Sequence, residues 1–373
     1  MSGRILIAGA SIAGTTLAYW LARHGLRPTV VERAPEPRMG GNGVDLRDEA
    51  MAVAERMGIM PQVREAAADV RGIKFVDADD RAVARIDMSR LQSGGGEVEI
   101  MRGDLVRLLH EAAGPGVEHL FGTAVQGIEQ DGDGVTVSFE GGASRRFDLV
   151  VGADGLHSTV RRLAFGPESG SVRHMGHYFA FAKADAALAE DRCVTMYNLP
   201  GKMAGVYRSG NHAQARAYFI FRSEPLTYDH RDTGEHKRLV RQAFGHETSW
   251  RVRELLAGAL DDPDFYFDAL SQVRMPSWSS GRVALAGDAA HCAAPASGAG
   301  AELAIVGAYR LAEALATAPD HTAAFRQYQE GHRGLVRREQ RIGPNVRMMV
   351  PKNRLGMWTR NVLVRSPLVS GGA

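Results

Sequence analysis

The sequence is poor in cysteine and nearly balanced in charge, and it lacks a long uninterrupted apolar run. Its two cysteines, Cys193 and Cys292, are too few for a disulfide framework or a cysteine-rich zinc site. A formal net charge of +2 argues against a dedicated nucleic-acid-binding protein. The apolar stretch at residues 5–22 is interrupted by glycine, serine and threonine. We therefore expect a soluble, cytoplasmic protein with neither a membrane nor a nucleic-acid partner.

The composition that remains is that of a folded globular protein. Hydrophobic residues make up 45% of the chain and charged residues 24%, which excludes a disordered or fibrous protein. The length of 373 residues exceeds that of one ordinary domain. It predicts two domains, or one large α/β domain with an insertion.

The first 35 residues carry the pattern strand, glycine turn, helix, strand. Residues 5–8 predict a buried strand, residues 9–14 (GASIAG) a tight turn, residues 15–24 a helix, and residues 26–31 a second strand that ends at Glu32. In such a unit the amides at the helix N-terminus hold a pyrophosphate, and the acid accepts hydrogen bonds from ribose hydroxyls. The candidate cofactor residues here are Gly9, Ser11, Ala13, Gly14, Glu32 and Arg33.

Two features of this unit qualify the prediction. Ser11 replaces the middle glycine of the usual fingerprint, and its small hydroxyl could itself hydrogen-bond a phosphate. Glu32 favours FAD or NAD, because a carboxylate would repel the 2′-phosphate of NADP. The alternative is a structural turn between strand and helix that binds no ligand.

Two later strands each end at an aspartate. Residues 147–153 lead into Asp154-Gly155, and residues 283–286 lead into Gly287-Asp288. The second is followed by PASGAGA at residues 295–301 and by an apolar helix at residues 303–316. Open α/β sheets bind ligands at the carboxyl ends of their strands, so both aspartates are candidate ligand-binding residues.

These three elements, in this order, resemble the FAD-dependent aromatic-hydroxylase family, which includes p-hydroxybenzoate hydroxylase. The resemblance implies that Asp288 binds the ribityl chain or pyrophosphate of FAD and that Arg102 lies on the FAD. It implies that Asp154 serves both FAD and NAD(P)H, although this carboxylate could instead cap the helix at residues 156–161. Arg102 could likewise pair locally with Asp104.

The turn before the apolar helix has an implied role as well. Gly298, Ala299, Gly300 and Ala301 resemble the helix start whose amides face the pyrimidine ring of the flavin. Two residues depart from the family pattern, which has Gln and Asn at the positions of Ala299 and Glu302. An acid beside the flavin would oppose a negatively charged reduced flavin, unless Glu302 points away or pairs with a cation.

Residues 38–46 (RMGGNGVDL) are similar in spacing to the compact tetracycline-inactivating monooxygenases within this family. By that resemblance Arg38 helps to hold the nicotinamide cofactor and Asp45 contacts FAD. The alternative for Arg38 is a solvated side chain on a surface loop. No second dinucleotide fingerprint is found, which agrees with transient docking of NAD(P)H.

The remaining segments predict a second domain. Short β-type runs at residues 73–75, 82–87, 177–182, 193–197, 204–207 and 215–221 indicate a mixed sheet. We expect an α/β protein with a discontinuous Rossmann-like FAD-binding domain and parallel sheet (1–72, 97–170 and 272–325). A mixed β-sheet substrate domain (73–96 and 171–271) and a C-terminal bridging helical segment (326–373) would complete it.

Aromatic and sulfur-containing side chains on these strands are candidates for the substrate pocket: Phe179, Phe181, Met196, Tyr207, Phe219 and Phe221. Strand alternation sends every second residue to the opposite face, so some of the six must be ordinary core. The pair His174 and His177 lacks a third ligand, and we predict no metal site.

The resemblance implies a single-component flavin monooxygenase. NAD(P)H would reduce FAD, O₂ would add at flavin C4a, and the hydroperoxide would transfer one oxygen atom to an aromatic ring, enol or polyketide. Such a reaction would serve antibiotic biosynthesis or the inactivation of a tetracycline-like drug. No catalytic side chain is assigned, because the flavin carries the chemistry. The alternatives are an FAD-dependent dehydrogenase or reductase, and a non-catalytic flavoprotein that binds a planar ligand; the protein would be a monomer or homodimer.

Overall fold

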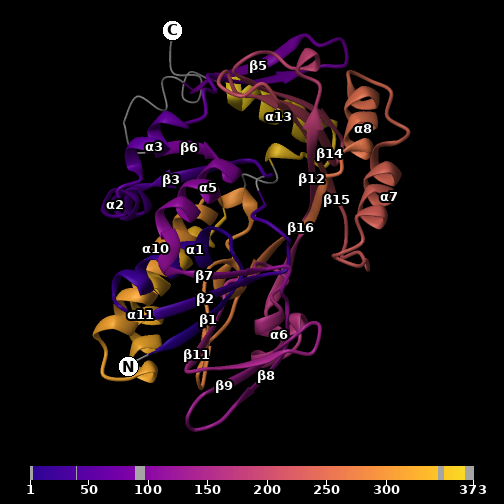
Figure 1. The fold of residues 1–373 in the computed structure, drawn as a ribbon. Helices are drawn as coiled ribbons and strands as arrows, with labels where there is room; N and C mark the ends of the chain where they lie inside the picture. The colour runs from indigo at the N-terminus through magenta and orange to yellow at the C-terminus, as the bar shows by residue number, and fades with distance from the viewer. Residues whose placement is uncertain (1–2, 39, 89–96, 343–347, 366–373) are drawn as a thin grey trace. The chain divides into compact units, whose positions relative to one another are not determined.

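The computed structural model describes residues 3–38, 40–88, 97–342 and 348–365 and divides the chain into two compact units (Figure 1). The first unit comprises residues 1–66, 98–173 and 271–341, and the second comprises residues 67–97, 174–270 and 342–373. Both units are therefore discontinuous in sequence. The C-terminal segment expected at residues 326–373 does not form a unit of its own, because the division between the two units falls after residue 341.

The first unit is built on a six-stranded sheet in the order β17-β18-β11-β1-β2-β7. Its strands are β1 (Arg4–Ala8), β2 (Arg27–Glu32), β7 (Glu118–Phe121), β11 (Leu149–Gly152), β17 (Ser279–Ser280) and β18 (Val283–Leu285). All neighbouring pairs are parallel except β17 with β18. The apolar runs at residues 5–8 and 149–151 are buried, as expected for strands covered on both faces. The predicted parallel sheet is confirmed.

Helix α1 (Ile12–Arg23) is the central helix of this unit, and it packs against α5 (Arg102–Ala113) and α10 (Gly300–Thr317). Residues 12–21 of α1 are all buried, because neighbouring helices and the sheet cover it from several sides. The other helices of the unit are α2 (Asp48–Arg56), α3 (Met60–Glu65), α6 (Thr159–Phe165), α9 (Asp288–His291) and α11 (His321–Glu339).

Two smaller sheets complete the described part of the first unit. One pairs β3 (Gly43–Arg47) with β6 (Glu97–Met101). The other contains β8 (Val125–Gln130), β9 (Val135–Phe139) and β10 (Ser144–Phe147) as an antiparallel meander. The meander was not predicted from the sequence. Buried and half-buried positions alternate along β9, which is typical of a sheet with one partly solvated face.

The second unit is built on a seven-stranded mixed sheet in the order β16-β12-β15-β14-β13-β4-β5. Its strands are β4 (Gly72–Val76), β5 (Ala82–Asp87), β12 (Val172–Ala184), β13 (Cys193–Leu199), β14 (Lys202–Arg208), β15 (Ala215–Arg222) and β16 (Tyr266–Val273). The predicted mixed sheet is confirmed, and each predicted run lies within one of these strands. The sequence reasoning missed β16.

Helices α7 (Thr233–Phe244) and α8 (Val252–Asp261) cover one face of this sheet and share a core with it (Figure 1). The sequence reasoning did not predict them, although Asp232 caps α7 by accepting a hydrogen bond from the amide of Glu235 at 3.0 Å. Helix α13 (Arg354–Arg365) packs against β5. None of the helices in the described ranges combines the length and apolar character that a membrane span needs.

Candidate functional site

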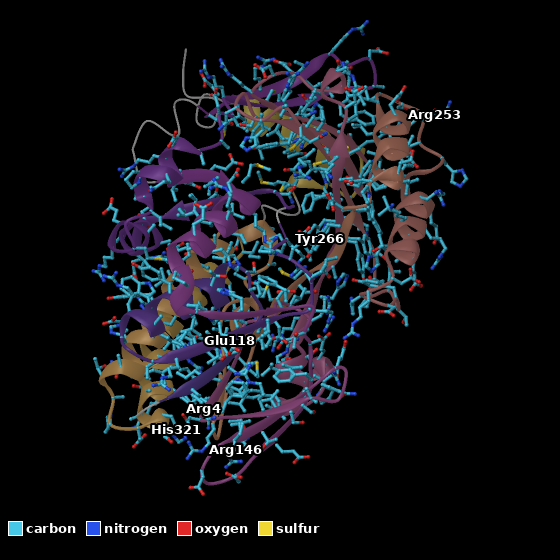
Figure 2. The ribbon with its side chains drawn as sticks, viewed as in Figure 1. Arg4, Glu118, Arg146, Arg253, Tyr266 and His321 are labelled. Atoms are coloured by element: carbon cyan, nitrogen blue, oxygen red, sulfur yellow. The ribbon has the colours of Figure 1, made fainter. Side chains whose placement is uncertain are left out.

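The parallel sheet of the first unit brings four separate chain segments to one edge. The strand register pairs Ala8 with Val31 on one side and with Gly152 on the other, and it pairs Gly152 with Leu285. The glycine turn, Glu32, Asp154 and Asp288 therefore all leave the sheet at its carboxyl edge. Arg4, labelled in Figure 2, begins β1 at the opposite edge. This arrangement is the one that open α/β sheets use to bind ligands.

The turn between β1 and α1 admits only glycine at two positions. A Cβ atom on Gly9, whose φ is +108°, would lie 2.4 Å from the carbonyl oxygen of Ala153. A Cβ atom on Gly14 would lie 1.9 Å from the carbonyl oxygen of Gly9. Both distances are far below van der Waals contact, so the turn and the first turn of α1 pack directly on backbone. The glycines thereby fix the position of the helix N-terminus at the sheet edge.

The carboxylate of Glu32 is held by two backbone amides. The amide of Ala10 donates to Oε2 at 3.0 Å, and the amide of Ala34 donates to Oε1 at 3.0 Å. Each oxygen keeps a further lone pair, so the carboxylate can also accept hydrogen bonds from two vicinal hydroxyls. The geometry fits the ribose role that the sequence predicts for Glu32.

Arg102, at the start of α5, reaches back to the glycine turn. Its Nη2 donates to Ser11 Oγ at 2.7 Å, and its Nη1 donates to the carbonyl oxygen of Gly40 at 3.1 Å. A Cβ on Gly41 would lie 3.1 Å from the Arg102 side chain, so glycine lets this loop pass close to it. The serine that departs from the fingerprint thus holds the guanidinium beside the N-terminus of α1. A cation there adds to the helix dipole in favouring an anion such as pyrophosphate.

Asp154 has a structural role in this unit. Its Oδ1 accepts a hydrogen bond from Ser158 Oγ at 2.5 Å, and its Oδ2 accepts one from the amide of Val160 at 3.1 Å. These contacts brace the start of α6, whose N-cap is Ser158, and the predicted contact of Asp154 with FAD and NAD(P)H stays a prediction. Burial raises the pKa of the Asp154 carboxyl, and the hydrogen bonds from Ser158 and Val160 oppose that rise.

Arg161 joins two of the edge segments, a role that sequence reasoning missed. Its side chain is 1% exposed. Nη1 donates to the carbonyl oxygen of Ala289 at 3.0 Å, and Nη2 donates to the carbonyl oxygen of Leu156 at 2.6 Å. The guanidinium therefore fixes the segment after β11 to the segment that carries Asp288. The available sequence signal was the position of Arg161, six residues after Asp154-Gly155.

Asp288 is exposed at the first position of α9, whereas Gly287 and Ala289 on either side of it are buried. A Cβ on Gly287 would lie 2.7 Å from the Cβ of Ala13 in α1. The aspartate is thus presented beside the start of α1, where the sequence places FAD. His291, one turn further, is buried 3.2 Å from Tyr328 Oη, and burial lowers its pKa to about 3. It is therefore neutral at physiological pH.

Asp45 forms an ion pair with Arg47, a residue that sequence reasoning did not single out. Arg47 Nη2 lies 2.9 Å from Asp45 Oδ2. A Cβ on Gly298, whose φ is +68°, would lie 2.9 Å from Arg47 Nη2 and 3.1 Å from Asp45 Oδ2. The pair therefore rests against the turn that precedes α10, and only glycine leaves room for it. Strand β3 is thereby brought to the predicted flavin segment.

The predicted flavin segment, residues 298–301, spans this turn and the first residues of α10. The amide of Ala299 is held by Ser297 Oγ at 3.1 Å. Glu302 follows in the first turn of α10 and is buried. Arg33 and Arg38, which the sequence also predicts near the cofactor, are both exposed.

The second unit presents an aromatic face on the side of its sheet opposite α7 and α8. Phe181 lies with its ring centroid 5.1 Å from that of Phe179 and 4.8 Å from that of Tyr218. Tyr266, labelled in Figure 2, is 45% exposed, and its ring stacks with Phe181 at 6.2 Å. Tyr207 continues the cluster at 6.2 Å from Tyr218. We define these five residues as the aromatic face.

The six predicted pocket residues separate into three groups in the structure. Phe179, Phe181 and Tyr207 belong to the aromatic face, and Met196 packs beside Phe75 in a small cluster of β4, β5 and β13. Phe219 and Phe221 point the other way, into the core beneath α7. The Phe219 ring lies 5.1 Å from that of Phe244. We therefore assign these two phenylalanines to packing within the second unit and no longer place them in the pocket.

The comparisons with known proteins agree with this geometry. A family model described as FAD binding domain matches residues 3–330. A flavin-dependent monooxygenase from an unknown prokaryotic organism is 38% identical over 91% of this chain and 88% of its own length. A flavin-dependent monooxygenase of Legionella longbeachae is 36% identical over 91% of this chain and 87% of its own. The chain belongs to the FAD-binding family of flavin-dependent monooxygenases.

A solved structure extends the likeness over both units. The crystal structure of tetracycline destructase Tet(51) matches with a TM-score of 0.85 at 33% identity, covering 98% of this chain and 96% of that one. The predicted family and fold are confirmed, and the protein is an FAD-dependent monooxygenase. The residues of the carboxyl edge fit FAD, because the glycine turn, the amide-held Glu32 and the exposed Asp288 offer donors and acceptors where an adenine dinucleotide needs them.

Proposed function

We propose that the protein uses NAD(P)H to reduce FAD and inserts one oxygen atom of O₂ into an aromatic or polyketide-like substrate. The observation that carries the proposal is the carboxyl edge of the first sheet, where four chain segments leave the sheet. In the turn between β1 and α1, a Cβ atom on Gly9 or Gly14 would collide with backbone. The bound flavin supplies the oxygen chemistry by activating O₂ at its C4a position. The chain itself holds, orients and electrostatically tunes the cofactor.

Three of the four edge segments, and the turn before α10, have proposed tasks toward FAD. Glu32 would accept hydrogen bonds from the adenosine ribose, and Arg102 with the N-terminus of α1 would bind the pyrophosphate. Asp288 would bind the ribityl chain or pyrophosphate. Residues 298–301 would face the pyrimidine ring. The amides of Gly298 and Ala299 donate to Pro295 O and Ser297 Oγ, so Gly300 and Ala301, at the N-terminus of the eighteen-residue α10, would offer theirs to stabilise negative charge on the reduced flavin.

Arg38 is the proposed contact of the nicotinamide cofactor. Its support is that the residue is exposed and that its loop adjoins residues 40–41, which lie against Arg102. An exposed guanidinium can pair with a phosphate of a transiently bound dinucleotide without being buried in the FAD site.

The proposed substrate class rests on the aromatic face and on similarity to named proteins. Planar polycyclic ligands stack on aromatic rings, and Tyr266 and Phe181 offer such rings in a nearly parallel arrangement, at 16°. Similar proteins include tetracycline destructases Tet(51) and Tet(55), at 33% and 36% identity. A tetracycline-like polyketide or a related fused-ring aromatic compound is therefore the first ligand to test.

A ligand screen of NADPH and NADH oxidation by the purified holoenzyme tests the proposal. Tetracyclines and simpler fused-ring phenols are added singly, and products are analysed by mass spectrometry. We expect one class to accelerate oxidation and to yield a product heavier by one oxygen atom. Accelerated oxidation with a dehydrogenated product would indicate a dehydrogenase. Flavin that neither nicotinamide reduces with any ligand present would indicate a binding flavoprotein.

A further inference from the structure

Glu302 is a carboxylic acid buried in the first turn of α10, directly after the segment proposed to face the flavin. The residue is 2% exposed. Its Oε1 is buried and accepts no hydrogen bond within the described ranges of the chain. The nearest cation is Arg338, whose Nη2 lies 3.6 Å from that oxygen. A buried carboxylate with an unsatisfied oxygen is costly when charged, so Glu302 gains a proton more readily than a solvated glutamate does.

The charged groups that act on Glu302 come from two regions packed against α10. From α11 they are Arg338 and Glu339, and from the junction of β3 with α2 they are Arg47 and Asp48. Helix α1 carries Arg23, in its last turn, as its one charged residue. Burial and the nearby Glu339 raise the pKa of Glu302, and Arg338 opposes this rise.

Both arginines near Glu302 are shared with other acids. Arg338 Nε lies 2.6 Å from Glu339 Oε1, and the Arg338 side chain is 63% exposed, so solvent screens its pull on Glu302. Arg47 is paired with Asp45. Glu302 is the most deeply buried carboxyl group of this cluster. Its side chain is 2% exposed, against 16% for Glu339 and 25% for Asp45, and Asp48 is exposed. Glu302 is therefore the acid best placed to take up a proton when negative charge is added nearby.

The same cluster touches the proposed flavin segment, so the inference rests on the proposed function. Arg47 lies against Gly298 on one side and interacts electrostatically with Glu302 on the other. Glu302 is two residues beyond Gly300, where α10 begins. Negative charge that develops at the pyrimidine end of a reduced flavin would therefore be felt at Glu302.

We propose that Glu302 takes up one proton when the bound flavin is reduced, and so makes the flavin midpoint potential depend on pH. In the balanced step, the reductant would give the flavin a hydride equivalent, that is two electrons and one proton, and solvent would give one further proton to the Glu302 carboxylate. One O–H bond forms and no bond in the protein breaks. The neutral acid then removes the charge repulsion that an ionised acid would impose on the reduced flavin.

Potentiometric titration of the FAD-loaded enzyme between about pH 6 and about pH 9 tests this proposal. Over the pH range in which Glu302 takes up its proton, the midpoint potential of the wild type should fall more steeply with pH than that of Glu302→Gln. The extra change should be tenfold in the redox equilibrium constant per pH unit, which is about 30 mV for a two-electron couple. The two curves should meet at the acid end, where Glu302 is protonated in both redox states. At the alkaline end the variant should have the higher potential.

The matched control is Glu313→Gln, which removes an acid from the same helix where it pairs with His24 at 2.6 Å. Its curve should follow that of the wild type. Parallel curves for wild type and Glu302→Gln, or coincident ones, would overturn the proposal. Glu302→Asp, which keeps a titratable group, should restore a steeper slope than Glu302→Gln.

A second measurement uses the wild-type enzyme alone, so it does not depend on whether a variant folds. The infrared difference spectrum of reduced minus oxidised wild-type enzyme should gain the C=O stretching band of a protonated carboxylic acid, and its absence would contradict proton uptake. Flavin content and oxygen insertion are measured on the same samples. A protein that binds FAD and oxygenates a ligand, but shows no band and no slope difference, would reject only the role of Glu302.

Discussion

The two large sheets of this protein differ in what their side chains are needed for. At the carboxyl edge of the first sheet, the decisive atoms are backbone amides and carbonyls, and glycines are required because a Cβ would collide with them. In the second sheet, side chains decide what each face does, and the backbone ladder is regular over most of β12, β14 and β15.

This difference explains why the ligand of the first sheet can be predicted from the sequence and that of the second cannot. Where a Cβ would collide with its neighbours, glycine is required at that position, as at Gly9, Gly14 and Gly298, and the requirement can be seen in the sequence. A requirement for an aromatic ring can be met by several residues on several strands. The cofactor is therefore identified from sequence with more detail than the substrate.

The largest effect should come from testing which face of the second sheet is core. Phe219→Ala removes a ring that is fully buried against Phe244, and it should lower the free energy of unfolding by about 3–5 kcal/mol. Phe181→Ala, on the aromatic face and half-buried, should cost roughly half as much or less. Denaturant unfolding of both variants measures the difference. Equal losses would mean that both faces are packed core.

A change at the glycine turn tests the claim that backbone packing fixes the first site. Gly9→Ala should lose bound FAD and cost about 1–3 kcal/mol of stability from overpacking, because its Cβ would lie 2.4 Å from the Ala153 carbonyl oxygen. The control Gly331→Ala lies in α11 with open space around it, and it should stabilise by about 0.5–1 kcal/mol. Flavin absorbance per protein and thermal unfolding report the two effects. A Gly9→Ala enzyme with full FAD content would refute the claim that backbone packing at this turn fixes the FAD site.

Arg38→Ala should separate the nicotinamide contact from the FAD contacts. Loss of a charge-assisted contact of about 1.5–3 kcal/mol should weaken NAD(P)H use about 10–150-fold and leave FAD content unchanged. Stopped-flow reduction of the bound flavin across nicotinamide concentrations measures this. Arg27→Ala, an exposed arginine at the opposite end of β2, should have no effect. If Arg38→Ala saturates at the wild-type concentration, Arg38 is a solvated loop residue.

Asp288→Ala should weaken FAD binding while the fold persists. Removing the acceptor leaves donors of the cofactor unpaired, at about 1–3 kcal/mol, or about 5–150-fold in Kd. Titration of the apoprotein with FAD, followed by flavin fluorescence, measures the change. Asp79→Ala, in a turn of the second unit where it pairs with Arg81, is the control and should bind FAD as the wild type does. Unchanged affinity in Asp288→Ala would reject its assignment.

The parts that sequence predicted follow from local rules. The unit from β1 to β2 was predicted because a glycine turn, a helix and Glu32 stand in a fixed order, and the structure places Glu32 between two amides. Arg102 was predicted by resemblance, but its bond to Ser11 spans 91 positions and could not be derived from spacing. The contact of Arg161 with the carbonyl oxygen of Ala289 was missed for the same reason, since it spans 128 positions.

The division of the second sheet into two faces could not be predicted either. Strand β12 is buried at residues 177–180 without interruption, so it shows no alternation of apolar and polar residues from which to assign a face. Helices α7 and α8, which decide that Phe219 and Phe221 are core, pack there through contacts distant in sequence.

Oxygen-isotope labelling tests the central claim most directly. The holoenzyme is supplied with NADPH, the best ligand from the screen, and ¹⁸O₂ in ordinary water, and the product is analysed by mass spectrometry. The account predicts a product that carries one labelled oxygen atom, formed only when FAD, the nicotinamide and the ligand are all present. An unlabelled product, or hydrogen peroxide formed in equal amount to the NADPH consumed, would contradict it.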